Sequence, residues 1–112
     1  MNDYSKKTSK EIKRLAKLAH ERELEKALSN LNSKFKQWEN KGLDSFELDK
    51  EIHKYYNKTS KEIFKKYNSN DLIDYFVAIA VVNNIIKKDE IKETAYQDLE
   101  LLIEKIKFRV EH

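Results

Sequence analysis

The most apolar stretch of the chain runs from Leu72 to Ile86, and Asp74 is its only charged residue. Its apolar side chains fall on every side of a helical wheel, which predicts a helix that other elements surround. The run is longer than the roughly 4–8 residues of an ordinary strand and shorter than the roughly 20 apolar residues of a membrane span. We therefore predict an all-α fold, a single-domain four- or five-helix bundle around this central helix. The domain is expected to occupy residues 8–112, behind a frayed polar N-terminus at 1–7.

The first helix is predicted to begin at a capping box formed by Thr8 and Glu11 and to run to about Asn40. Its apolar residues fall into two stripes on nearly opposite sides, with the charged segment 20–23 between them. The first stripe contains Ile12, Leu15, Ala16 and Ala19, and the second contains Leu24, Leu28, Leu31, Phe35 and Trp38. Either the helix bends at 20–23, or one straight helix offers different faces to different neighbours. We favour packing of the first third within the same domain over an arm that reaches a second chain.

A turn is expected after the first helix, with Gly42 in the left-handed C′ position of a Schellman motif. In that arrangement Trp38 and Leu43 are the apolar pair that touches across the helix end. Asp44 is the expected N-cap of the next helix, and Glu47 takes its N3 position. The spacing predicts two helices that are joined by a short turn and packed antiparallel.

The second helix is expected to be interrupted near Asn57. Residues 57–60 are weak helix formers, and Thr59 with Glu62 matches another capping box. The hexapeptide KTSKEI occurs at 7–12 and again at 58–63. We interpret the repeat as two helix starts that share one capping solution, and the alternative is a duplicated basic surface element. The apolar residues expected to be buried along this helix are Leu48, Ile52, Tyr55, Ile63, Phe64 and Tyr67.

The polar segment 87–90 is expected to end the central helix, with Asp89 as the N-cap of a last helix that runs to about Val110. One buried stripe is predicted along that helix, formed by Ile91, Ala95, Leu99, Leu102, Ile106 and Val110, with Ile103 alongside. Leu101 and Phe108 are seven positions apart and lie off this stripe. They are either isolated exposed apolar residues or a helix–helix contact, and they are our candidate partner interface.

The composition supports a helical protein. The 112 residues include no Pro and one Gly, and 38% of them are charged. Strands need turn residues at short intervals, and this chain lacks them. The absence of Cys excludes disulfides and thiolate metal sites. The polar N-terminus has no apolar core of a signal peptide, which favours a cytoplasmic location.

Positive charge gathers in two segments, although the net charge of the whole chain is only +3. Six basic and two acidic residues give segment 1–20 a net charge of +4, and five basic and one acidic residue give segment 52–70 the same value. The basic residues form two Lys-rich islands, 6–17 and 54–66, and tyrosines beside them are able to stack on bases. The expected nucleic-acid contacts are Lys10, Lys13, Arg14, Lys17, Lys58, Lys61, Lys65 and Lys66. Because Lys predominates over Arg, the bidentate reader of guanine, a solvated lysine surface is the favoured interpretation.

Residues that carry enzyme chemistry are sparse. His53, with Asp49 one turn before it, is the best candidate for an acid–base pair. No nucleophile or second base can be placed beside them, so we interpret the pair as a local ion pair on a helix. His20 and His112 belong to no metal-ligand motif. We predict that the protein is not an enzyme and that it has no catalytic residue, cofactor or metal site.

These observations favour a small non-enzymatic cytoplasmic interaction or regulatory protein that works through a helical face. Its partner is another protein or, in a homodimer, a second copy of the chain, and Leu101 and Phe108 are the predicted contact. The alternative is a basic helical nucleic-acid-binding protein that uses islands 6–17 and 54–66. No membrane association is expected, because the first apolar stripe is too small for strong interfacial binding.

Overall fold

The computed structural model describes residues 4–111, which form helices and contain no strand. The α-helices of that range are α1 (Lys6–Glu39), α2 (Ser45–Lys54), α3 (Ser60–Tyr67), α4 (Ile73–Val82) and α5 (Glu93–Glu111). A π-helical segment, η1 (Tyr55–Thr59), joins α2 to α3, and a 3₁₀ turn, η2 (Lys88–Glu90), precedes α5. The predicted all-α bundle is confirmed. Its described part has four helical rods if α2, η1 and α3 are taken as one, and five α-helices if they are separated.

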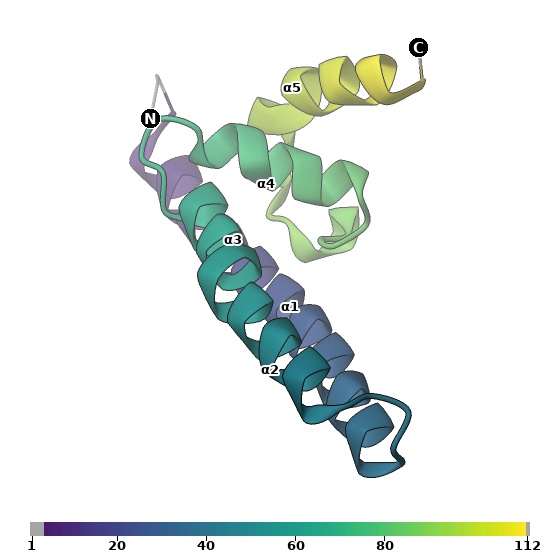
Figure 1. The fold of residues 1–112 in the computed structure, drawn as a ribbon. Helices are drawn as coiled ribbons and strands as arrows, with labels where there is room; N and C mark the ends of the chain where they lie inside the picture. The colour runs from purple at the N-terminus through teal and green to yellow at the C-terminus, as the bar shows by residue number, and fades with distance from the viewer. Residues whose placement is uncertain (1–3, 112) are drawn as a thin grey trace.

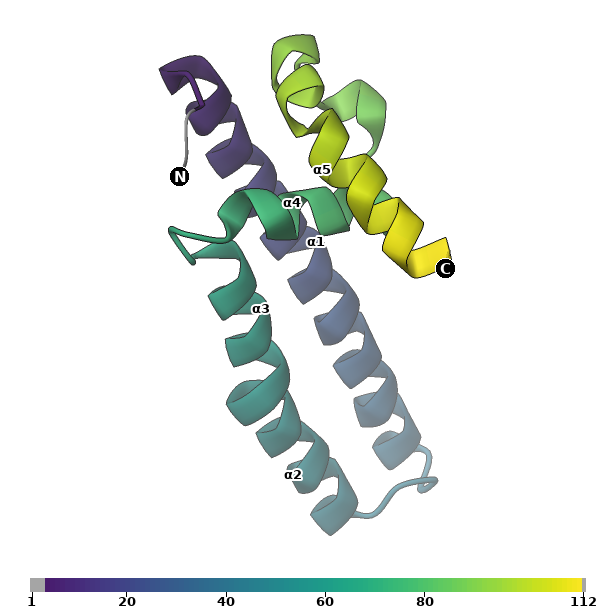
Figure 2. The same cartoon turned by 90° about the horizontal axis from the view of Figure 1, so that it is seen from above.

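The chain forms a long antiparallel hairpin with two further helices at its open end (Figure 1). One side of the hairpin is α1, and the other is the rod made by α2, η1 and α3. α4 crosses the hairpin near the open end, and α5 packs on α4 and on α1 (Figure 2). The closed end of the hairpin, residues 24–54, projects away from α4 and α5, and we call it the arm. The molecule is therefore elongated, with extents of 52 × 28 × 23 Å.

The core lies where α1, α3, α4 and α5 meet. Val77, Ala78 and Ala80 of α4 have no exposed surface, and α4 contacts α1, α3 and α5. The first stripe of α1 faces the same core, and its residues Ile12 and Leu15 are fully buried. The prediction that the apolar run forms the central helix is thus confirmed, and the first third of α1 packs within the same chain.

α1 passes through residues 20–23 without interruption. All of its buried residues lie between Thr8 and Ala19. Its first third packs under α4 and α5, and the remainder faces the rod made by α2, η1 and α3 (Figures 1 and 2). The sequence left open whether the helix bends between its two apolar stripes or stays straight with different neighbours on different faces. The second alternative is correct.

α4 ends four residues earlier than the apolar run. Asn84 adopts a left-handed φ of 62°. Its backbone N–H donates to the Val81 carbonyl over 3.1 Å, and the N–H of Ile85 donates to the Ala80 carbonyl over 2.9 Å. This is a Schellman motif, with Asn tolerating the conformation that most side chains avoid. Ile86 lies beyond the helix end and is still fully buried.

The start of α1 differs from the prediction. Ser5, not Thr8, is the N-cap, and its Oγ accepts the backbone N–H of Thr8 over 3.1 Å. The helix therefore begins at Lys6, within the segment 1–7 that was expected to fray; residues 1–3 lie outside the described part of the chain. Thr8 and Glu11 are both 3% exposed and are used for tertiary contacts instead of capping.

The hairpin turn is placed as predicted, but its left-handed residue is Lys41 (φ 62°) and not Gly42. The N–H of Gly42 donates to the Gln37 carbonyl over 2.8 Å, so the Schellman motif is shifted by one residue and its C3–C″ pair is Gln37 and Gly42. The predicted pair of Trp38 and Leu43 is therefore wrong. The capping box at the start of α2 is confirmed, because Asp44 and Glu47 each accept the other's backbone N–H.

The expected break near Asn57 is a π-helical turn and not a new helix start. Thr59 keeps helical backbone angles and makes no capping hydrogen bond, so the second predicted capping box is wrong. The N–H of Ser60 donates to the Tyr55 carbonyl, five residues back. One extra residue is thereby inserted into the helix, which keeps α2 and α3 in one rod and rotates the face that α3 presents to α1.

The predicted boundaries of the last helix are wrong at its start and partly wrong in its burial. Asp89 lies in η2 and caps nothing, because α5 begins at Glu93. The buried stripe forms as expected through Leu99, Ile103 and Ile106. Val110 is nevertheless 71% exposed, since the end of α5 extends past α4 (Figure 1).

Candidate functional site

The two predicted interface residues lie on the outer face of α5. Leu101 is 68% exposed and Phe108 is 62% exposed, whereas Leu99 and Ile103 on the opposite face have no exposed surface. Their position off the buried stripe is confirmed. Their contact with a partner stays a prediction.

The arm keeps an exposed apolar surface, formed by residues of the second stripe of α1. Leu28, Phe35 and Trp38 are 47%, 37% and 40% exposed, and we call these three residues the arm strip. Only α2 and η1 lie against this part of α1, and Leu48 is the one buried residue of α2. A single neighbouring rod covers one side of the stripe and leaves the other open.

Seven of the eight candidate nucleic-acid contacts are exposed: Lys10, Lys13, Arg14, Lys17, Lys58, Lys61 and Lys65. Two of the eight, the exposed Arg14 and the half-buried Lys66, are engaged within the chain. Arg14 binds Glu11, and Lys66 donates to the Glu23 carboxylate over 2.7 Å. The fold thus separates the basic residues into an accessible group and two that hold helices together.

Ring contacts link α1, just after the first basic island, to α3, which contains the end of the second island. The His20 ring on α1 meets Phe64 of α3 edge-on, with 6.0 Å between centroids, and stacks on Tyr67 at 6.1 Å. Tyr67 is buried and donates its hydroxyl to Glu23, and both burial and this hydrogen bond raise the pKa of Tyr67. Sequence reasoning missed this cluster. The only signal in the sequence is that His20 and Glu23 are three residues apart, as are Phe64 and Tyr67. Which residues of the two helices face each other depends on the register that the hairpin turn sets.

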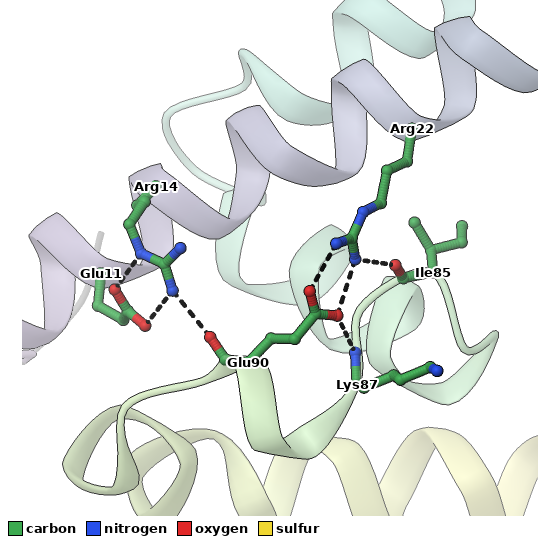
Figure 3. Close-up of polar contacts among 6 residues, drawn as sticks. All are labelled: Glu11, Arg14, Arg22, Ile85, Lys87 and Glu90. Carbon is green, nitrogen blue, oxygen red and sulfur yellow. Dashed lines mark hydrogen bonds and ion pairs between the residues drawn. The ribbon is translucent and has the colours of Figure 1, made fainter.

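Two charged contacts attach α1 to the segment between α4 and α5 (Figure 3). In the first, the Arg14 guanidinium binds both oxygens of Glu11 at 2.7 and 2.8 Å and also donates to the Glu90 carbonyl at 2.8 Å. The backbone N–H of Lys92 donates to Glu11 Oε2 over 3.0 Å. These contacts, Arg14 foremost, lower the pKa of Glu11 although burial opposes the change.

In the second contact, Arg22 of α1 forms a bidentate pair with Glu90 of η2 at 2.8 and 2.5 Å. The same guanidinium donates to the Ile85 carbonyl over 2.8 Å, and the Lys87 N–H donates to Glu90 Oε1 over 2.9 Å (Figure 3). The Arg22 hydrogen bonds lower the pKa of Glu90 to about 2. The arrangement closes the exit of α4 against α1, and we interpret it as structural because three of the five guanidinium N–H donors bind groups of the chain itself.

Two hydroxyls attach the start of α1 to α4 and α5. Tyr4 donates to Asp74 over 2.8 Å, and burial followed by this hydrogen bond raises the pKa of Tyr4 to about 12. Thr8 donates its hydroxyl to Asp98 over 2.8 Å. The one charge of the central apolar run, Asp74, therefore serves as an acceptor for the N-terminal segment.

The candidate acid–base pair has the geometry of a surface ion pair. His53 Nδ1 and Asp49 Oδ2 are 3.5 Å apart, and their side chains are 65% and 68% exposed. His112 lies outside the described residues. Within residues 4–111 no three His, Cys, Asp or Glu side chains gather in a way that would hold a metal ion. No helix in that range is long and apolar enough to cross a membrane.

Comparison with known proteins gives no further guide: no family model, curated protein or solved structure matches this chain. The candidate surfaces are therefore those that the structure itself defines: the arm strip, the outer face of α5, and the two basic islands.

Proposed function

We propose that this chain is a non-enzymatic cytoplasmic interaction protein whose helical contact face is the arm, and that the partner is a second copy of the chain. The observation that supports this most is the arm strip. Three large apolar side chains, Leu28, Phe35 and Trp38, keep more than a third of their surface exposed on a two-helix projection. Burying apolar surface contributes about 25 cal/mol per Å², so the open side of the strip favours association.

A second arm fits this surface better than an unrelated charged partner. The arm carries six basic and six acidic residues in 24–54, so two copies meet without net repulsion. Two antiparallel hairpins that share their apolar seams make a four-helix bundle, which covers the sides that a lone hairpin leaves open. A two-fold dimer also presents the same patch on both copies, as an isologous contact requires.

Light-scattering mass after size exclusion tests this proposal, with two matched double variants. L28D/F35D places two charges in the arm strip, and L101D/F108D places the same charges on the outer face of α5. We expect a dimer for the wild type and for L101D/F108D, and a monomer with unchanged helical circular dichroism for L28D/F35D. A monomeric wild type overturns the proposal. A dimer that only L101D/F108D dissociates moves the contact to α5.

A second candidate, nucleic-acid binding, is favoured by one observation. His20, three residues after the first basic island, contacts Phe64 in the second, where Tyr56 and Phe64 are 66% and 57% exposed next to Lys61 and Lys65. Bases of single-stranded nucleic acids stack on exposed aromatic rings among lysines.

Fluorescence anisotropy with a single-stranded RNA oligonucleotide tests whether the chain binds nucleic acid. Affinity should fall steeply with salt and be lost in K61Q/K65Q but not in K36Q/K41Q, two exposed arm lysines. Equal affinity of both variants excludes this surface.

A further inference from the structure

A hollow of about 420 Å³ lies between α1 and the loop from α3 to α4. Lys13, Lys17 and His20 line it from α1, and Tyr67, Asn68 and Asn70 line it from the other side. Its size is within the roughly 300–1,000 Å³ of small-molecule sites. The segments that line it, the first half of α1 and the loop between α3 and α4, lie at the open end of the hairpin, away from the closed end of the arm (Figure 1). The hollow therefore does not depend on self-association through the arm.

The charge in this hollow is positive and uncompensated. Lys13 and Lys17 are exposed, and neither ammonium group is within ion-pair distance of a carboxylate of the described residues. No acidic side chain is among the described residues that line the hollow. The nearby Glu23 is already bound by Lys66 and Tyr67. The larger hollow of about 800 Å³, by contrast, is lined by both Glu23 and Glu62.

Neutral donors complete the site. Asn68 uses one amide hydrogen on the Phe64 carbonyl over 2.8 Å, and an amide group carries a second. Asn70 is exposed in the loop and adds another amide. The His20 ring is fixed in position by its stack on Tyr67, 6.1 Å between centroids, and these two rings with Ile73 give the hollow an apolar wall.

We propose that this hollow binds the phosphate group of a small phosphomonoester. A phosphomonoester carries close to two negative charges at neutral pH, and Lys13 with Lys17 supplies two positive ones. Lysine binds phosphate as a mobile point charge, and amide donors beside it fix the remaining oxygens. The ring wall of His20 and Tyr67 accommodates the organic part of the ligand.

NMR titration of the full chain tests this proposal, with inorganic phosphate, adenosine 5′-monophosphate and adenosine as the added compounds. Shifts of the His20 ring and of the Asn68 and Asn70 side-chain amides report binding. We expect both phosphate compounds to shift these signals and adenosine to leave them unchanged. Adenosine shifts equal to those of the monophosphate, or no shift with either phosphate compound, overturn the assignment.

A matched pair of variants distinguishes specific binding in the hollow from nonspecific attraction to positive charge. K13Q/K17Q removes two charges from the hollow, and K6Q/K7Q removes two exposed charges from the first turn of the same helix. We expect affinity for the monophosphate to fall about tenfold or more in the first variant and to stay near the wild-type value in the second. An equal loss in both variants overturns the site. We also expect an oligonucleotide without a terminal phosphate to bind more weakly than the monophosphate. If it binds as tightly, the hollow is a site for a nucleic-acid backbone, and the small-ligand proposal is wrong.

Discussion

Arg22 and Glu90 are 68 positions apart in the chain and form a bidentate ion pair that closes the end of α4 against α1. Arg22 also caps the Ile85 carbonyl, and Glu90 also accepts the Lys87 N–H. One ion pair therefore satisfies two backbone groups in the irregular segment between α4 and α5, the Ile85 carbonyl and the Lys87 N–H. In this contact two side chains stabilise elements that are distant in the sequence.

The Glu90 carboxylate should make folding stability depend on acid pH. Its pKa is lowered from 4.5 to about 2 in the folded chain, so its contribution is fully present above the unfolded value and is lost as the pH falls from about 4.5 to about 2. The lowered pKa of Glu11 acts in the same direction. We expect Glu90→Gln to flatten the pH dependence of the free energy of unfolding, measured by urea denaturation across that range. Glu100→Gln, an exposed carboxylate on α5, should leave the dependence unchanged.

The hydrogen bond from Thr8 to Asp98 should be detectable as an energetic coupling. Thr8→Val keeps the shape of a buried side chain and removes the hydroxyl, so stability should fall by about 1 kcal/mol. In a double-mutant cycle with Asp98→Ala, the second substitution should cost less once the first is present. Additive losses would mean that the hydroxyl stabilises α1 locally and not through α5.

Two leucines on opposite faces of α5 provide a test of the core. Leu99 has no exposed surface, so Leu99→Ala should lower the free energy of unfolding by about 2–5 kcal/mol. Leu101 is 68% exposed, and Leu101→Ala should change it by less than about 0.5 kcal/mol in the monomer. Chemical denaturation of both variants measures the difference. Similar losses at the two positions would contradict the orientation of α5.

The hairpin turn should tolerate the loss of its only glycine. Gly42 does not have a positive φ, and a Cβ at that position would meet the Gln37 carbonyl oxygen at 3.4 Å, an ordinary contact. Gly42→Ala should therefore change stability by less than about 0.5 kcal/mol. Lys41→Gly should stabilise the turn, because Lys41 holds the left-handed conformation that costs other residues about 1 kcal/mol. A large loss in thermal stability for Gly42→Ala would place the left-handed residue at Gly42.

Capping motifs were the least dependable local signals in this chain. The box at Asp44 and Glu47 forms because both residues are exposed at a turn and have no competing partner. The same type of motif at Thr8 and Glu11 does not form, because α5 and Arg14 use those side chains. A capping box describes what a side chain does in an isolated helix, and a buried tertiary partner changes that choice.

The sequence by itself determined the helical class, the central apolar run, the hairpin turn and the buried stripe of α5, since these follow from periodicity and from local turn chemistry. It did not reveal which neighbour covers each face. The exposure of Phe35 and the meeting of His20 with Phe64 depend on the register between α1 and α3 and on where α4 crosses the hairpin. Helical periodicity identifies an apolar face but not how many helices lie against it. Only tertiary packing decided that the arm has one neighbouring rod, and that Lys13 and Lys17 border a hollow whose described lining residues include no carboxylate.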